Sequence, residues 1–196
     1  MRPENREKRE AEIAAVAYKL LEDKGFDGVS MLMIARQAKA SNETLYRWYG
    51  GKLGLFKALV GRNTDEVSAV LDDLPATADL HTALARIGPV LLGMLLGARA
   101  VALNRAAASD ATGDLGKALA SAGREVVGPK LAALMAMQDM TLSPREAAEL
   151  YITLLVGDQQ IRRVTGAMPE PSPDAIQARS DIALERFFVL AGLTPG

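Results

Sequence analysis

Hydrophobic residues near the start of the chain recur at every third or fourth position, which is the spacing of one face of an α-helix. The stripe consists of Ile13, Val16, Ala17, Leu20 and Leu21. It predicts a helix from about residue 6 to residue 24, and Gly25 then stands where a helix commonly ends in a left-handed residue. Phe26, which follows, is expected to fill the core beneath this helix.

Two shorter helices are predicted next, with a tight turn between them. Ser30 and Ser41 stand at their N-cap positions, where a hydroxyl accepts a bond from a free backbone N–H. The inward positions are Met31, Ile34, Ala35 and Ala38 in the first helix, and Leu45 and Tyr49 in the second. The spacing predicts a helix-turn-helix motif over residues 30–49.

The second of these helices is expected to carry an outer face suited to DNA. Thr44, Tyr46, Arg47 and Trp48 supply hydroxyls, a guanidinium and an indole N–H that can reach phosphates or base edges. Lys52 opens the following helix, where its charge and the free N–H groups both favour a phosphate. The other interpretation, ordinary polar residues on the surface of a small helical hairpin, stays open.

The rest of the pattern also predicts helices. They cover about 52–71, 79–97, 98–108, 114–138, 144–165 and 174–192, with a break at Leu74-Pro75-Ala76-Thr77 and a polar loop at 109–113. Ser143-Pro144-Arg145-Glu146 carries an N-cap Ser, Pro at the first helical position and Glu at the third. Hydrophobic residues make up 49% of the chain, with Ala, Leu and Met dominant. We therefore expect an all-α protein of about nine helices.

Charge separates the two parts of the chain. Residues 1–62 hold 12 Lys and Arg against 8 Asp and Glu, whereas the remainder holds 11 against 16. A mildly basic head on an acidic body is typical of a DNA-binding domain joined to a regulatory domain.

Chemistry other than binding has little support. His81 is the single histidine, expected to be solvated, there is no cysteine, and no nucleophile elbow, phosphate loop or metal-ligand spacing occurs. We expect no enzyme activity, no cofactor and no metal. The charged N-terminal residues are unlike a signal peptide, and the longest uncharged apolar run, 87–98, is too short to span a bilayer. A cytoplasmic protein without a membrane partner is expected.

The motif and its flanks resemble the TetR family of transcriptional regulators over about residues 8–68. The matching residues are Gly25-Phe26, Ile34-Ala35, Ser41, Thr44-Leu45-Tyr46, Trp48-Tyr49, Lys52 and Leu55-Phe56. The resemblance implies a DNA-binding domain at 1–51, a connecting helix from residue 52, and a regulatory and dimerisation domain at 52–196. It also implies a homodimer on a palindromic double-stranded operator. The expected DNA-binding residues are Ser30, Arg36, Ser41, Asn42, Glu43, Thr44, Tyr46, Arg47, Trp48 and Lys52.

Three residues depart from the family pattern. Lys39 stands in the turn where the family usually has Gly, so the turn is either strained by about 1 kcal/mol or differently shaped. Met33 takes a position that is usually polar. Glu43 either accepts a hydrogen bond from a cytosine or complements the helix dipole.

The helices at 144–165 and 174–192 are apolar on more than one side, which suggests a partner subunit. We expect a four-helix dimer interface with Ile152, Leu155, Leu184 and Phe188, and Leu155 and Phe188 as its anchors; burial within one subunit is the alternative.

An apolar effector is the remaining expectation. Two Gly-Pro pairs, at 88–89 and 128–129, either bow their helices apart around a cavity or merely curve them. The expected ligand-binding residues are Leu91, Met94, Leu95, Met135, Tyr151, Leu154 and Asp158. Asp158 is expected on the buried face with Leu154 and Ile161, paired either with an internal Arg or with a cationic ligand. The whole pattern favours a repressor released by its effector; a helical carrier or protein-interaction module without DNA binding is the alternative.

Overall fold

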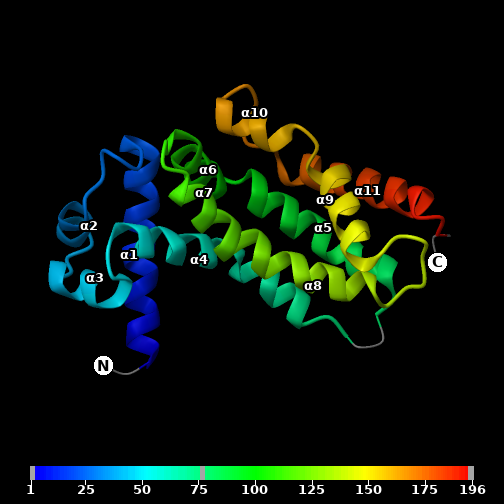
Figure 1. The fold of residues 1–196 in the computed structure, drawn as a ribbon, viewed down its shortest axis with the longest axis horizontal. Helices are drawn as coiled ribbons and strands as arrows, with labels where there is room; N and C mark the ends of the chain where they lie inside the picture. The colour runs from blue at the N-terminus through cyan, green and yellow to red at the C-terminus, as the bar shows by residue number, and fades with distance from the viewer. Residues whose placement is uncertain (1–2, 76–77, 194–196) are drawn as a thin grey trace. The chain divides into compact units, whose positions relative to one another are not determined.

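The computed structural model describes residues 3–75 and 78–193, and within these ranges the chain is helical with no β-strand. The predicted all-α class is confirmed (Figure 1). In chain order the elements are α1 (Pro3–Lys24), α2 (Met31–Gln37), α3 (Asn42–Tyr49), α4 (Lys52–Asp72), α5 (Leu80–Leu96), α6 (Ala98–Ser109), α7 (Asp114–Leu119), a π-helical stretch η1 (Ala120–Arg124), α8 (Glu125–Met135), α9 (Pro144–Val156), α10 (Gln159–Thr165) and α11 (Pro173–Leu190). Ala76 and Thr77, in the expected break, lie outside the described residues.

The helix number differs from the expected nine because two expected helices are interrupted. The expected helix at 114–138 contains η1, which ends just before Glu125, the residue whose carbonyl Pro129 cannot bond. The expected helix at 144–165 breaks at Gly157, where φ is 53°. Sequence periodicity did not reveal either interruption, since the apolar spacing continues through both.

The chain forms two compact units. Unit 1 contains Met1–Arg62 and Ala102–Ala122, and unit 2 contains Asn63–Val101 and Gly123–Gly196. This division differs from a simple boundary after residue 51, because the start of α4 and most of α6 and α7 pack with the N-terminal helices. Their contribution includes Leu55, Phe56, Leu103 and Leu115, all buried.

The core of unit 1 follows the predicted stripe of α1. The buried residues of this stripe are Ile13, Ala17, Leu20 and Leu21. The Tyr18 hydroxyl donates a hydrogen bond to the Leu59 carbonyl oxygen at 2.5 Å. Phe26 contacts the edge of the Phe56 ring, with the ring centroids 5.7 Å apart. Gly25 follows α1 with φ 67°, as predicted for its end.

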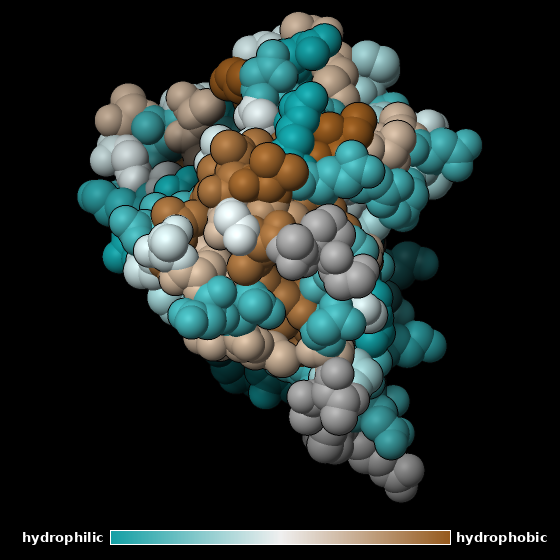
Figure 2. Space-filling model, turned by 90° about the vertical axis from the view of Figure 1, so that its right-hand side faces the viewer, coloured by the Kyte–Doolittle hydropathy of each residue, from teal (hydrophilic) through white to brown (hydrophobic). Residues whose placement is uncertain are grey.

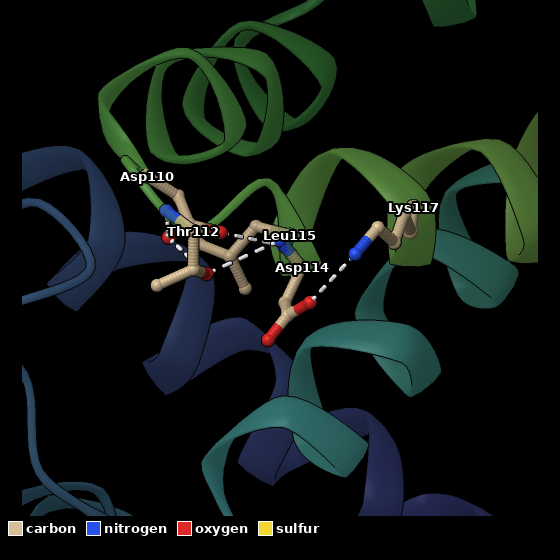
Figure 3. Close-up of polar contacts among 5 residues, drawn as sticks. All are labelled: Asp110, Thr112, Asp114, Leu115 and Lys117. Atoms are coloured by element: carbon tan, nitrogen blue, oxygen red, sulfur yellow. Dashed lines mark hydrogen bonds and ion pairs between the residues drawn. The ribbon is translucent and has the colours of Figure 1, made fainter.

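A polar loop joins α6 to α7 within unit 1 (Figure 3). The Asp110 carboxylate accepts hydrogen bonds from the Thr112 hydroxyl at 2.7 Å and the Leu115 backbone N–H at 2.8 Å. The Leu115 N–H, followed by the other bonds from this loop, lowers the pKa of Asp110. The carboxylate therefore satisfies orphan donors at the start of α7 and fixes the loop.

Unit 2 is a helical bundle in which α11 packs along α5 and α9, and α8 packs along α9 (Figure 1). Side chains from all four helices form its core, among them Leu84, Leu92, Leu131, Tyr151 and Phe187. Asp79, Ser143 and Ser172 cap α5, α9 and α11, and Ser143 and Glu146 complete the predicted capping box. The helix starts read from the sequence are thus confirmed.

Helix α5 comes close to its neighbours at Gly88. A Cβ atom there would lie 2.1 Å from Ser180 Oγ and 2.5 Å from the Tyr151 hydroxyl oxygen. The Tyr151 hydroxyl donates to the Leu84 carbonyl at 3.2 Å. The glycine of the first Gly-Pro pair therefore leaves room for two side chains of the same unit. At Gly128, in the second pair, no described atom beyond the chain neighbours and the backbone of its own helix lies within 4 Å of such a Cβ.

The C-terminal end of α5 is capped by side chains of α10. Gln160 donates to the Leu95 carbonyl at 3.3 Å, and Arg163 Nε donates to the Leu96 carbonyl at 2.8 Å. The Arg163 guanidinium also bonds the Met168 carbonyl and the Glu170 carboxylate, each at 3.2 Å. These are orphan acceptors of a helix end, and a cation at a helix C-terminus also complements the dipole.

Arg163→Ala is expected to destabilise unit 2 by about 2–3 kcal/mol, since it removes charge-assisted hydrogen bonds from a side chain that is 12% exposed. Arg162→Ala is the matched control: its side chain is 49% exposed and lies 3.9 Å from Asp158. We expect that control to change stability by less than about 0.5 kcal/mol. Urea unfolding followed by circular dichroism measures both, and equal effects would contradict this role of Arg163.

The single histidine is placed differently from the expectation. His81 is half-buried rather than solvated, and its ring meets the edge of the Phe188 ring with centroids 5.3 Å apart.

In the described part of the chain no single helix has the length and apolar character needed to cross a membrane. Helices α5 and α6 have that length and apolar character only as a pair, which is bent by 52° at the junction.

Candidate nucleic-acid interface

The helix-turn-helix predicted at 30–49 is present as α2 and α3. Ser30 Oγ accepts the Met33 N–H at 3.2 Å, and Ser41 Oγ accepts the Thr44 N–H at 3.0 Å. Both N-caps were predicted from the sequence and are confirmed. The Ser41 and Thr44 hydroxyls also share a hydrogen bond at 2.7 Å, which orients both at the start of α3.

The turn between the two helices places a lysine in a glycine conformation. Lys39 has φ 51°, and among the described residues it is the one residue other than glycine with a positive φ. The Ala40 N–H donates to the Ala35 carbonyl at 2.8 Å, and the Lys39 N–H donates to the Arg36 carbonyl at 3.2 Å. This is a Schellman motif with Lys39 at C′, so the turn keeps the usual hydrogen bonds and bears the strain of a side chain there.

The inner sides of α2 and α3 are apolar, as predicted. Ile34, Ala35 and Leu45 are buried in the core of unit 1, with Tyr49 half-buried beside them. Met33 is half-buried and packs against the same core, which explains why an apolar residue is tolerated at this position. Leu45 is the buried residue of α3, so this helix is held by few side chains.

The outer side of α3 is open. Asn42, Glu43, Tyr46 and Arg47 are exposed, and Tyr46 is 51% exposed despite its large ring. Ser30, Arg36 and Ser41 are exposed on the neighbouring segments. A capped helix with free N–H groups at its start and these side chains on its outer face can bind phosphates and read base edges.

Three of the expected DNA-binding residues are less free than the sequence suggests. Thr44 is half-buried and bonded to Ser41. Trp48 packs partly on the core, meets the edge of Tyr49 and lies under the Arg6 guanidinium at 5.4 Å from the ring centroid. Lys52 Nζ lies 4.0 Å from the centroid of Phe26, and burial lowers its pKa against the influence of Asp27.

The expected effector residues belong to unit 2, and one of them is placed differently from the expectation. Leu91, Met135 and Tyr151 are buried in its core, and Met94, Leu95 and Leu154 are half-buried against it. Asp158, however, is not buried: its side chain is 71% exposed, and it pairs with Arg162 at 3.9 Å. The break at Gly157 ends α9, so Asp158 and Ile161 leave the face that Leu154 occupies.

The expected dimer anchors are also placed differently. Leu155, Leu184 and Phe188 are buried within the single chain, and Ile152 is half-buried. Leu155 and Phe188 therefore cannot anchor a partner in this fold, and the alternative of burial within one subunit holds for them. The large apolar side chains that α11 exposes are Ile182, Val189 and Leu190. Figure 2 shows hydrophobic side chains gathered at the centre of the face beyond the end of α11.

The fold is that of a helical protein whose N-terminal helix-turn-helix presents an outer face suited to DNA. The sequence model described as "Bacterial regulatory proteins, tetR family" matches residues 13–59. An uncharacterized HTH-type transcriptional regulator, YdeS of Bacillus subtilis (strain 168), is 48% identical over 40 residues. That match spans 20% of each chain.

Solved structures match along nearly the whole chain. A TetR-family regulator from Mesorhizobium loti has a TM-score of 0.76 at 23% identity, covering 93% of this chain and 96% of its own. The flavonoid-responsive regulator FrrA has a TM-score of 0.66 at 25% identity, with the same coverage of both chains. FadR of Bacillus subtilis, in complex with stearoyl-CoA, has a TM-score of 0.71 at 13% identity, covering 94% of this chain and 99% of its own.

The matches agree with the geometry of both units. The helix-turn-helix of unit 1 matches the TetR-family model, and the rest of the chain shares the fold of TetR-family regulators of known structure.

Proposed function

We propose that the protein is a homodimeric transcriptional repressor that binds a palindromic double-stranded operator and is released by a small apolar effector. The observation that carries the proposal is the outer face of α3, where Asn42, Glu43, Tyr46 and Arg47 are exposed on a helix capped by Ser41. In this proposal α3 enters the major groove, and the half-sites lie about one helical turn, ~34–36 Å, apart. Action on genomic DNA implies a cytoplasmic protein.

Specificity is proposed to come from the exposed α3 side chains, with positioning supplied by the surrounding cations. Arg47 can bond a guanine edge, and Glu43 can accept from a cytosine amino group. Arg36 and Lys52 are proposed to bind phosphates, for which Lys52 must turn away from Phe26.

Dimerisation is proposed through α9 and α11, as the family implies, but with different anchors from those first expected. Ala178, Ile182 and Val189 are exposed at helical spacing along α11, and Ile152 is half-buried on α9. A twofold axis would place this stripe against its copy, which buries the apolar surface that one subunit leaves open.

The effector is proposed to enter unit 2 beside the half-buried residues Met94, Leu95 and Leu154 and to reach Leu91, Met135 and Tyr151 by separating α5 from its neighbours. Met side chains suit such a site because they adapt to varied shapes. Release from DNA requires that the effector bind the non-operator conformation more tightly. Stabilisation of the protein by apolar compounds in a thermal-shift screen, together with their release of bound DNA, tests this part.

The DNA-binding proposal is tested by selecting duplexes from a random-sequence pool with the wild-type protein. A palindromic consensus is expected. Arg47→Ala is expected to weaken binding to that consensus by about 1–3 kcal/mol and to relax the preference at one base pair, and Tyr46→Ala to weaken binding without unfolding. Fluorescence anisotropy over a series of salt concentrations measures the affinities.

The matched control removes the same charge from unit 2. Arg145→Ala on α9, where the side chain is 86% exposed, is expected to leave the affinity unchanged. Failure to select any consensus, or equal losses in Arg47→Ala and Arg145→Ala, would refute the proposed site and favour a helical carrier or interaction module.

A further inference from the structure

Arg9 of α1 reaches the turn of the helix-turn-helix from a position 30 residues earlier in the chain. Its Nη2 donates to the carbonyl oxygen of Lys39, and its Nη1 pairs with Glu12 Oε2 at 2.6 Å. Both ends of the guanidinium are therefore occupied, and its charge is balanced by a carboxylate on the next turn of α1. Nothing in the sequence around either residue signals this contact.

The carbonyl that Arg9 bonds belongs to the strained position of the turn. Lys39 stands in the left-handed conformation, which disfavours any side chain with a Cβ. The backbone N–H groups of the turn are satisfied by the Schellman bonds, and the Arg9 donor satisfies the Lys39 oxygen. A charge-assisted bond to this oxygen stabilises the left-handed turn against relaxation.

Arg6 makes a second contact from the same face of α1 to the other end of α3. Its guanidinium lies 5.4 Å from the Trp48 ring centroid, and its Nε donates to Glu10 Oε1 at 2.8 Å. Residues three apart share a helix face, so Arg6 and Arg9 point to the motif together. They contact α3 at its far end and the turn before its start.

The recognition helix needs such support. It has eight residues and one fully buried side chain, Leu45, and a helix this short has little stability of its own. Its direction is therefore set by what holds its two ends.

We propose that Arg9, together with Arg6, is a positioning residue for the recognition helix: α1 holds the Lys39 turn and Trp48, and so fixes the angle at which α3 meets DNA. This rests on the proposed DNA-binding function. A basic residue near a helix-turn-helix would ordinarily be assigned to phosphate contact, and the two roles predict different responses to mutation.

The experiment uses the full chain, the duplex consensus selected from the random pool, and a duplex of random sequence. Arg9→Gln is expected to weaken binding to the consensus about tenfold (~1.4 kcal/mol). The salt dependence and the affinity for random duplex should not change, because in this role Arg9 bonds Glu12 and the Lys39 carbonyl and contacts no phosphate. Arg9→Lys should also lose affinity, since an ammonium lacks the guanidinium fork. Arg36→Gln is the reference for a phosphate contact and should lower the salt slope by about one.

A second variant tests the turn itself. Glycine adopts the left-handed conformation without strain, so Lys39→Gly should make the turn independent of Arg9. In that background, Arg9→Gln should cost less than about threefold in affinity, a coupling that a double-mutant cycle measures. Equal losses in both backgrounds, or a salt slope lowered by about one in Arg9→Gln, would overturn the positioning role.

Trp48 gives a measurement that needs no DNA. It is the single tryptophan of the chain, so its fluorescence reports on α3 alone. Arg9→Gln and Arg6→Gln should shift its emission to the red and increase quenching by iodide, and Lys39→Gly should reverse the shift in Arg9→Gln. Unchanged fluorescence in both single variants would overturn the positioning role even if the protein selects a consensus. A wild type that selects none would instead refute the proposed function.

Discussion

Gly88→Ala is expected to destabilise the protein by about 2–3 kcal/mol, although alanine is the better helix former. The new Cβ would lie 2.1 Å from Ser180 Oγ and 2.5 Å from the Tyr151 hydroxyl oxygen. Tyr151 of α9 is fully buried, and its ring packs edge-on against Phe187 of α11 with the ring centroids 5.6 Å apart. The side chain therefore has little room to move away. Its bond to the Leu84 carbonyl would be lost with any displacement. Urea unfolding monitored by circular dichroism measures the change.

Gly128→Ala is the matched control, since it also precedes a proline inside a helix. Apart from its chain neighbours and the backbone of its own helix, no described atom lies within 4 Å of the Cβ position at Gly128, and its φ is not positive. The steric restriction that proline places on the preceding residue applies equally at both sites. We therefore expect Gly128→Ala to leave stability unchanged or to raise it by up to about 1 kcal/mol.

Changes in stability of opposite sign for the two substitutions would show that the two Gly-Pro pairs have different structural roles. Gly88 would then serve close packing of α5 against α9 and α11, and Gly128 would be an ordinary helical glycine. If Gly88→Ala were as mild as Gly128→Ala, α5 would have to be free to move away from Tyr151. That result would favour the interpretation in which the Gly-Pro pair bows α5 outward around a ligand.

The features that could be predicted from the sequence are those that depend on residues close together in the chain. Ser41 and Ser143 were placed as N-caps because a hydroxyl at that position bonds backbone within the next turn, and the structure has both bonds. The inward face of the helix-turn-helix was equally predictable, since Leu45 and Ile34 follow helical spacing over a short distance. The exposed face of α3 followed from the same register.

The predicted orientation of side chains was wrong where a helix is interrupted, because the helical spacing was extended past the break. The expected burial of Asp158 assumed one continuous helix from 144 to 165, whereas Gly157 breaks it and turns Asp158 to solvent. The assignment of Leu155 and Phe188 to a dimer interface failed for a different reason. Apolar residues on two sides of a helix show that both sides are covered, and periodicity does not tell a neighbouring helix from a partner subunit.

Contacts between distant segments gave no signal at all. The strain expected at Lys39 could be read from a missing glycine, yet the bond from Arg9 that stabilises it joins residues of ordinary type. The same holds for Arg163, whose caps on the end of α5 depend on how α10 packs. Such contacts arise from tertiary packing and leave no periodic trace in the sequence.

Val189→Glu is expected to convert the proposed dimer into a folded monomer, whereas Phe188→Glu should unfold unit 2. These neighbours point to different sides of α11: Val189 is 75% exposed and Phe188 is 5% exposed. A carboxylate at position 189 remains in water in the single chain, but in the dimer it would be buried in an apolar interface opposite its own copy. Helical circular dichroism should therefore be retained while sedimentation shows half the mass.

Phe188→Glu acts on the core of the chain itself. The Phe188 ring packs between Phe187, at a centroid distance of 6.0 Å, and His81, at 5.3 Å. Removing a buried Phe costs about 3–5 kcal/mol, and an unpaired carboxylate in its place adds a further penalty. Because the total stability of a domain is about 5–15 kcal/mol, most of unit 2 should unfold. A Val189→Glu protein that still sediments as a dimer would place the interface elsewhere, and a folded, dimeric Phe188→Glu protein would contradict the packing of α11 against α5.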